Sequence, residues 1–159
     1  TRSMSAESVV DLPEPVGRFV WDFTNGTQGW GAMMGIGSVT AQDGALVFET
    51  SSPDPAITCG LNALRASKYP YIIIRMKIDA VTADKEMGQL FWTTPTAGAS
   101  EAASAKSELI GDGQYHDYVV HLAENNRWRG RITTFRLDPC SHAGAKVAIE
   151  EIRMSEDGK

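Results

Sequence analysis

The sequence predicts an all-β fold, a two-sheet antiparallel β-sandwich. Short runs rich in Val, Ile, Phe, Tyr, Trp and Thr recur along the chain, and these residue types favour strands. Turn-forming residues separate the runs at short intervals, and no segment has the apolar period of a convincing amphipathic helix. The 159 residues suit one domain with a sizeable core.

The first strands are predicted near the start of this domain. RFVWDF at 18–23 is one, and a hairpin follows with strands at 38–42 and 45–50. Asp43-Gly44 joins the two hairpin strands, and Asp-Gly between strand-like runs is among the strongest hairpin signals.

The segment 69–81 is the strongest predicted strand. Ile72, Ile74, Met76 and Ile78 share one phase, whereas Arg75 and Lys77 share the other. This alternation predicts one buried face and one solvated face, with the two cations on the solvated side. The remaining strands are predicted at 88–94, 106–110, 115–123, 131–139 and 145–154.

An aromatic pair lies within the strand GQLFWTT. Phe91 and Trp92 are neighbours, and neighbouring side chains of a strand point to opposite faces. One ring is therefore expected in the core and the other on the outer face. Parity alone leaves both assignments open, because Gln89 shares a phase with Phe91 and Leu90 shares one with Trp92.

Composition restricts the class of protein. The formal net charge is −5, which argues against a nucleic-acid partner, and no apolar run approaches the length of a membrane span.

Residues 1–17 read as a linker or tag-like extension, 18–154 as a single sandwich module, and 155–159 as a polar tail. Cys59 and Cys140 are expected as buried free thiols, with a disulfide as the alternative.

The order of several motifs resembles a known family. The motifs are IIIRMK, FWTT, DGQYHDYVVHL and WRGRITTFRLDP, within a match from about Phe19 to Met154. Together they resemble the galactose-binding-like jelly-roll carbohydrate-binding modules that are appended to bacterial polysaccharide-degrading enzymes. The resemblance implies two packed antiparallel sheets, a sugar site on a sheet face or in an edge-loop cleft, and often a structural calcium ion.

Sugar sites recurrently place an aromatic ring against the apolar face of a pyranose and polar groups where they pair with its hydroxyls. Trp92 is the leading candidate for the ring, with burial of Trp92 and an outer Phe91 as the alternative. Trp128, in an Arg- and Asn-rich loop, is either a ligand clamp or a cap on the sandwich. The candidate polar groups are Arg75, Arg136, Gln89 and Lys77.

Two kinds of ion recognition are also considered. Calcium requires oxygen ligands, and Asp22, Asp43, Asp138 and Glu150 fall at predicted strand ends where the family resemblance implies an ion. A basic cluster of Arg127, Arg129 and Arg131, which Arg75 and Arg136 would join if their strands are neighbours, would favour an anionic polysaccharide, but a solvated basic loop is the preferred interpretation.

Catalysis is not expected. No nucleophile elbow, phosphate loop or HExxH motif appears in the sequence. Glu150 and Glu151 are adjacent and are therefore expected on opposite faces of a strand, where they cannot flank one glycosidic bond.

The predicted function is a monomeric, non-catalytic module that binds a polysaccharide or oligosaccharide. As part of a larger secreted or cell-surface protein, it would target a covalently linked catalytic domain. The alternatives are a structural or protein-docking sandwich and, less favoured, a jelly-roll glycanase or polysaccharide lyase.

Overall fold

A computed structural model describes residues 19–79 and 86–159. These residues contain eleven strands and three short 3₁₀ turns. The strands are β1 (Val20–Trp21), β2 (Trp30–Met34), β3 (Thr40–Gln42), β4 (Ala45–Glu49), β5 (Ala56–Arg65), β6 (Tyr71–Asp79), β7 (Met87–Thr93), β8 (Ser104–Glu108), β9 (Asp112–His121), β10 (Arg131–Asp138) and β11 (Lys146–Ser155). The 3₁₀ turns are η2 (Ala66–Lys68), η3 (Glu101–Ala103) and η4 (Leu122–Glu124).

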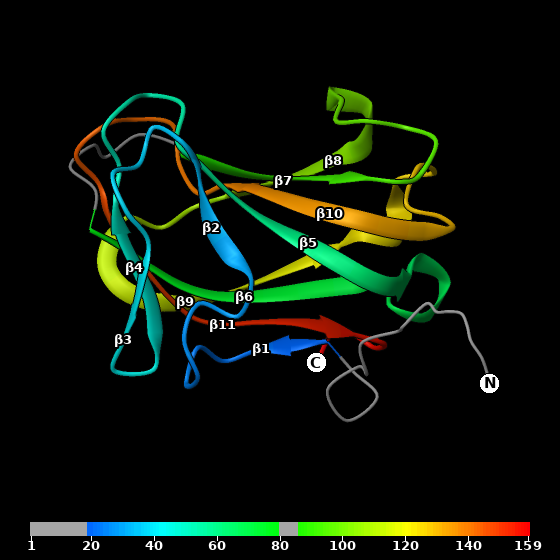
Figure 1. The fold of residues 1–159 in the computed structure, drawn as a ribbon, viewed down its shortest axis with the longest axis horizontal. Helices are drawn as coiled ribbons and strands as arrows, with labels where there is room; N and C mark the ends of the chain where they lie inside the picture. The colour runs from blue at the N-terminus through cyan, green and yellow to red at the C-terminus, as the bar shows by residue number, and fades with distance from the viewer. Residues whose placement is uncertain (1–18, 80–85) are drawn as a thin grey trace.

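The strands form two antiparallel sheets that pack face to face, as the sequence predicts. One sheet has the order β3-β4-β11-β6-β9, with β1 paired to β11, and the other has the order β2-β5-β10-β7-β8. We call them the β11 sheet and the β10 sheet. Figure 1 shows them as two layers, with β7, β8 and β10 above β6 and β11.

The core between the sheets is aromatic and aliphatic. The Trp128 ring stacks on Phe135 with centroids 6.1 Å apart, and Trp21 meets Trp30 edge to face at 6.0 Å. Ile72, Ile74, Met76 and Ile78 all point inward from β6. The alternation predicted for this strand is therefore confirmed, and residues 80 and 81 of the predicted segment lie outside the described part of the chain.

The predicted hairpin is confirmed. Thr40 pairs with Val47 and Gln42 pairs with Ala45 around the turn. Asp43 and Gly44 have φ angles of 53° and 77°, and a turn with positive φ at both central residues matches the right-handed twist of the flanking strands.

Two strands were not predicted. β2 runs through WGAMM and β5 through AITCGLNALR, and β5 is a central strand between β2 and β10. The predicted first strand is shorter than expected, since β1 covers only two residues. The predicted strand at 106–110 begins two residues earlier, directly after η3.

A bulge in β11 corrects one prediction. The pairing of β11 with β6 shifts register between Ile149 and Glu151, so that one extra residue is accommodated. Ile149 and Ile152 are both buried, whereas Glu150 and Glu151 both lie outside the core. The prediction that the two carboxylates point to opposite faces was wrong because regular alternation does not continue through the bulge.

Both cysteines are buried free thiols, so the simpler of the two sequence interpretations is confirmed. The C-terminal residues fold back on β11, where the Ser155 hydroxyl accepts a hydrogen bond from the Gly158 amide at 2.9 Å. Within the described ranges, no helix is long and apolar enough to cross a membrane.

Candidate functional site

A groove crosses the outer face of the β11 sheet. Two rows of side chains in cross-strand register line it. The small-residue row runs from β3 to β6 through Thr40, Val47, Ala148 and Lys77, and Tyr115 of β9 continues its register beside the groove. The charged row lies two residues further along the strands and consists of Glu49, Lys146 and Asp79.

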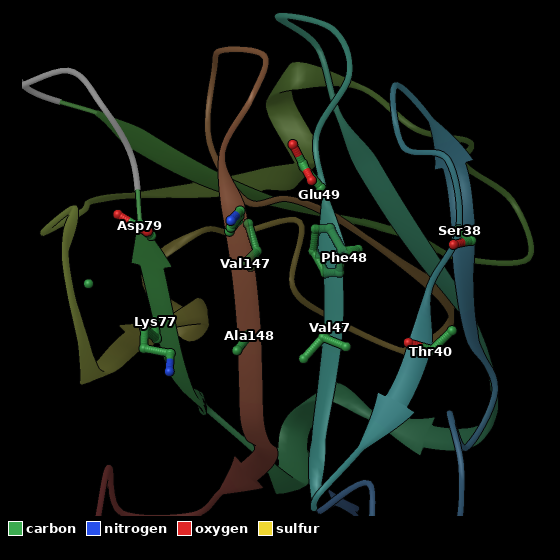
Figure 2. A pocket seen from close by; sticks show the side chains of 11 residues that line it. Ser38, Thr40, Val47, Phe48, Glu49, Lys77, Asp79, Val147 and Ala148 are labelled. Atoms are coloured by element: carbon green, nitrogen blue, oxygen red, sulfur yellow. The ribbon is translucent and has the colours of Figure 1, made fainter.

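The shape of the groove follows from side-chain size along the small-residue row. Ala148 and Val47 are short and apolar and form the floor, while Lys77 and Thr40 are longer or polar and stand on either side (Figure 2). The resulting hollow has a volume of about 560 Å³. Five strands at the usual spacing span roughly 19 Å, so the face can accommodate an extended ligand.

The charged row offers free hydrogen-bonding groups. Lys146 stands directly opposite Glu49 on one neighbouring strand and Asp79 on the other. In the described part of the chain, none of these three side chains makes an ion pair within 4.0 Å or a hydrogen bond. They are therefore available to pair with an external ligand.

A network of fixed charges borders the groove on the β9 side. Lys77 Nζ lies 4.9 Å from the Tyr115 ring centroid, and Arg75 Cζ lies 5.3 Å from the same ring. Arg75 also donates to Glu150 at 2.8 Å and to Asp117 at 3.3 Å. These hydrogen bonds raise the pKa of Arg75 above its ordinary value, and they hold its guanidinium in one place.

The opposite face of the sandwich has a different character. Arg136 donates two hydrogen bonds to Asp138, at 2.8 and 2.9 Å, and lies over the Phe91 ring at 4.8 Å. Gln89 donates to Ser104 at 2.9 Å. These polar groups of the β10 sheet thus satisfy one another, whereas the charged row on the β11 sheet has no such pairing among the described residues.

The prediction that Trp92 is a sugar platform was wrong, and the alternative assignment holds. Trp92 is 1% exposed and lies in the core, where its ring meets Trp128 edge to face at 5.2 Å. Its indole N–H donates to the Arg127 carbonyl at 3.0 Å. Phe91 is the outward ring, although Arg136 covers it.

Trp128 is likewise a structural residue rather than a clamp. It is 6% exposed, and its indole N–H donates to the carbonyls of Ala66 and Tyr69 at 3.1 and 2.9 Å. The ring closes one end of the sandwich, which was the second of the two interpretations of this residue.

The predicted binding residues do not share one surface. Arg75 and Lys77 lie on the outer face of the β11 sheet, whereas Arg136 and Gln89 lie on the outer face of the β10 sheet. Only Lys77 lines the groove. Sequence reasoning missed Thr40, Val47, Glu49, Asp79, Lys146 and Ala148, which are unremarkable individually and meet only through cross-strand register.

The four predicted calcium ligands do not form one site. Asp138 ends β10 and is paired with Arg136, whereas Glu150 belongs to the other sheet and is paired with Arg75. Asp43 lies in the β3–β4 turn. Asp22 accepts hydrogen bonds from the amide and hydroxyl of Thr24, which lower its pKa. Calcium binding itself stays a prediction, but these four carboxylates cannot bind one ion together.

The predicted basic cluster lines a second hollow, of about 380 Å³, at one end of the sandwich. Arg127, Arg129 and Arg131 form one side, and Thr96 and Ser100 belong to the facing loops. Among the residues that the structure describes, no carboxylate lies within 4.0 Å of these three arginines.

Two packed antiparallel sheets with a groove across one outer face define a class of protein, the β-sandwich modules. Comparison with solved structures finds this fold in carbohydrate-binding modules. A family 28 module, described as specific for non-crystalline cellulose, is 15% identical with a TM-score of 0.59, covering 84% of this chain and 90% of its own.

Two further neighbours have the same fold. A family 86 low-affinity xylan-binding module from Roseburia intestinalis is 12% identical with a TM-score of 0.56, covering 87% of this chain and 94% of its own. A family 29 module complexed with cellulohexaose is 13% identical with a TM-score of 0.53, covering 81% and 82%. At these identities the likeness establishes the shared fold. No family model and no curated protein matches the sequence.

Proposed function

We propose that this chain is a non-catalytic carbohydrate-binding module and that the groove on the β11 sheet holds its ligand. The observation that carries the proposal is the free charged row beside an apolar floor. Glu49, Lys146 and Asp79 offer both acceptors and donors without a partner among the residues that the structure describes, and sugar hydroxyls need both. The fold neighbours, which are carbohydrate-binding modules, support the same function.

The two rows divide the work of binding a pyranose chain. Ala148 and Val47 provide a flat apolar floor for the C–H groups of a sugar, and the charged row lies beside it for the hydroxyls. This division of apolar walls and convergent polar groups is typical of small-molecule sites. The ligand we propose is a neutral polysaccharide segment that lies across the strands.

The expected affinity is weak. Phe48 lines the groove but is largely buried, and the Tyr115 ring beside the groove already faces Lys77 and Arg75, so stacking on a sugar contributes little. Three or four hydrogen bonds at about 0.5–1.5 kcal/mol net each give a total of roughly 2–6 kcal/mol, and a Kd of 1 mM corresponds to about 4 kcal/mol. We therefore expect a Kd in the millimolar to high-micromolar range.

The proposal extends to the role of the module. We infer that it acts as a monomer within a larger secreted chain and tethers a polysaccharide-degrading enzyme to its substrate. Tethering raises the effective concentration of an attached enzyme without any additional contact, which suits a module of low intrinsic affinity.

Affinity electrophoresis against soluble cellulose, xylan and mannan derivatives, followed by isothermal titration calorimetry, tests the binding site. Lys77→Ala should weaken binding at least tenfold, since a hydrogen bond to a charged group is worth about 1.5–3 kcal/mol. Ala148→Ile should abolish it, because a branched side chain fills the floor while remaining favourable in a strand.

Lys106→Ala is the matched control, because Lys106 is an exposed strand lysine on the other sheet. It should bind like the wild type. If Lys77→Ala and Ala148→Ile both fold and keep wild-type affinity, the groove is not the binding site. Failure of the wild type to bind any of these glycans would instead favour the structural or protein-docking alternative.

A further inference from the structure

A cluster of three chemically different metal-ligand side chains lies away from the groove floor. Glu86 precedes β7, and Cys140 and His142 belong to the loop between β10 and β11. Cys140 is 3% exposed, and the side chains of Glu86 and His142 are 12% and 19% exposed. A thiol, an imidazole and a carboxylate therefore meet in a largely buried place.

The geometry of this cluster suits a shared central atom. The three ligand atoms all lie within 4.8 Å of one another, and His142 Nδ1 is 3.0 Å from Glu86 Oε1. Tetrahedral zinc with Zn–S near 2.3 Å and Zn–N or Zn–O near 2.0 Å separates its ligands by about 3.3–3.6 Å. The observed spacing requires only small side-chain adjustments to reach that arrangement.

His142 provides an independent observation. Both of its ring nitrogens are buried, and neither has a hydrogen-bond partner among the described residues. Nδ1 and Glu86 Oε1 are close, yet they are not aligned as donor and acceptor. A buried polar atom without a partner is costly, and a metal ion between these two atoms would satisfy the nitrogen.

The surroundings hold the three side chains in position. The Ser141 amide donates to Glu86 Oε1 at 3.0 Å, and the Leu109 amide donates to the Glu86 carbonyl at 2.9 Å. The Thr50 hydroxyl donates to the His142 carbonyl at 2.8 Å. Such supporting contacts orient the ligands of protein metal sites.

The ligand types identify the metal class. Zinc accepts thiolate, imidazole and carboxylate ligands together, whereas calcium and magnesium take oxygen ligands. One thiolate and one carboxylate carry two negative charges, which balance a divalent cation in a buried place. Binding would form the Zn–Sγ bond and release the Cys140 thiol proton to solvent.

We propose that Glu86, Cys140 and His142 form a zinc site, with water as the fourth ligand. The ion fastens the β10–β11 loop to the start of β7. Thr50 links this loop to β4, because its amide donates to the Ala145 carbonyl at 2.9 Å. The site thus stabilises the end of the sandwich at which the charged row lies.

Calorimetric titration of tag-free, reduced, metal-free protein with ZnCl₂ tests the proposal. We expect one ion per chain with micromolar or tighter affinity. Cys140→Ser and His142→Gln should each weaken binding roughly 100-fold or more, since even supporting residues of metal sites cost 10–100-fold. Zinc at 100 times its Kd should raise the Tm by about 5–10 °C.

Cys59→Ser and His116→Gln are the matched controls, because they remove a buried thiol and an imidazole that lie outside the cluster. Both should bind zinc like the wild type. Co²⁺ in place of Zn²⁺ provides a readout on the unmutated protein, where a thiolate-to-cobalt charge-transfer band is expected. Absence of that band, no zinc binding by the wild type, or unchanged binding by folded Cys140→Ser protein would each overturn the site.

Discussion

Trp92 provides the sharpest distinction between a ligand platform and a structural residue. Its ring is almost completely buried between the sheets, against Trp128, and its N–H donates to the Arg127 carbonyl. Replacing it should therefore change the free energy of unfolding rather than the affinity for a glycan. Two substitutions, Trp92→Ala and Trp92→Phe, separate the contribution of the buried ring to stability from that of the indole hydrogen bond.

The magnitudes follow from the contacts. Trp92→Ala removes a fully buried ring, and such substitutions cost about 3–5 kcal/mol. Trp92→Phe keeps a ring against Trp128 but removes the hydrogen bond, worth about 1 kcal/mol, and leaves a small cavity, so we expect a loss of about 2 kcal/mol. At about 2–4 °C per kcal/mol for a domain of this size, the Ala variant should melt about 6–20 °C lower.

Urea denaturation followed by tryptophan fluorescence and circular dichroism measures both losses. Titration of the same variants with a groove ligand should show unchanged Kd values below the unfolding transition, because Trp92 lies in the β10 sheet and the groove lies on the β11 sheet. A loss of affinity in Trp92→Phe with wild-type stability would refute this reasoning and restore the platform role.

Further expected outcomes concern the turn, the thiols and the ions. Gly44→Ala should cost about 1–2 kcal/mol in urea denaturation, because Gly44 has a φ of 77°, which an L side chain adopts only with strain; an unchanged midpoint would contradict this. Burial raises the pKa of Cys59 to about 12 from 9.0, so the folded state holds this proton more tightly than the unfolded state. The Cys59 contribution to the free energy of unfolding is fully present below pH 9 and is lost as pH rises towards 12. The stability of Cys59→Ala should therefore fall less steeply over this pH range than that of the wild type, and an equally steep fall in both proteins would contradict the prediction. In the Cys140→Ser variant, which lacks one of the proposed zinc ligands, EDTA should lower the Tm if the predicted calcium ion is bound, and readdition of Ca²⁺ should restore it; an unchanged Tm would contradict the calcium prediction. Arg129→Ala should weaken binding of a sulfated or uronic glycan at low salt and leave neutral glycans unaffected; equal effects on both would exclude an anion site at the arginine hollow.

The two-sheet architecture was predictable because apolar and polar side chains alternate regularly along strands that have one buried face. β6 is the clearest case, with four inward apolar residues and two outward cations. The Asp43-Gly44 turn was predictable for a different reason, since its two positive φ angles restrict the choice of residues at those positions.

β5 escaped prediction because its pattern is interrupted. Ile57 and Cys59 of β5 point inward, and the next buried side chain that the structure describes in this strand is Leu64, five residues further on. The pairing with β10 shifts register between Ile132 and Thr134, so the inward phase changes within the strand. A period of two read from the sequence fails wherever such an irregularity occurs.

The sites were less predictable than the fold because their residues meet only through tertiary structure. Phe91 and Trp92 are adjacent, and no local rule decides which one faces the core. Ala148 and Val47 are inconspicuous in sequence and become a floor only through cross-strand pairing. Glu86 and Cys140 are far apart along the chain, and the folded sheets alone bring them within reach of one metal ion.

Among the described strands, those at the two ends of the small-residue register have no further neighbour in their sheet. β3 and β9 are the two edges of the β11 sheet, so a glycan that lies along the row leaves the protein surface at both sides. The site would then recognise the interior of a polymer rather than its reducing or non-reducing terminus. Extending an oligosaccharide beyond the width of the sheet would add length without adding contacts.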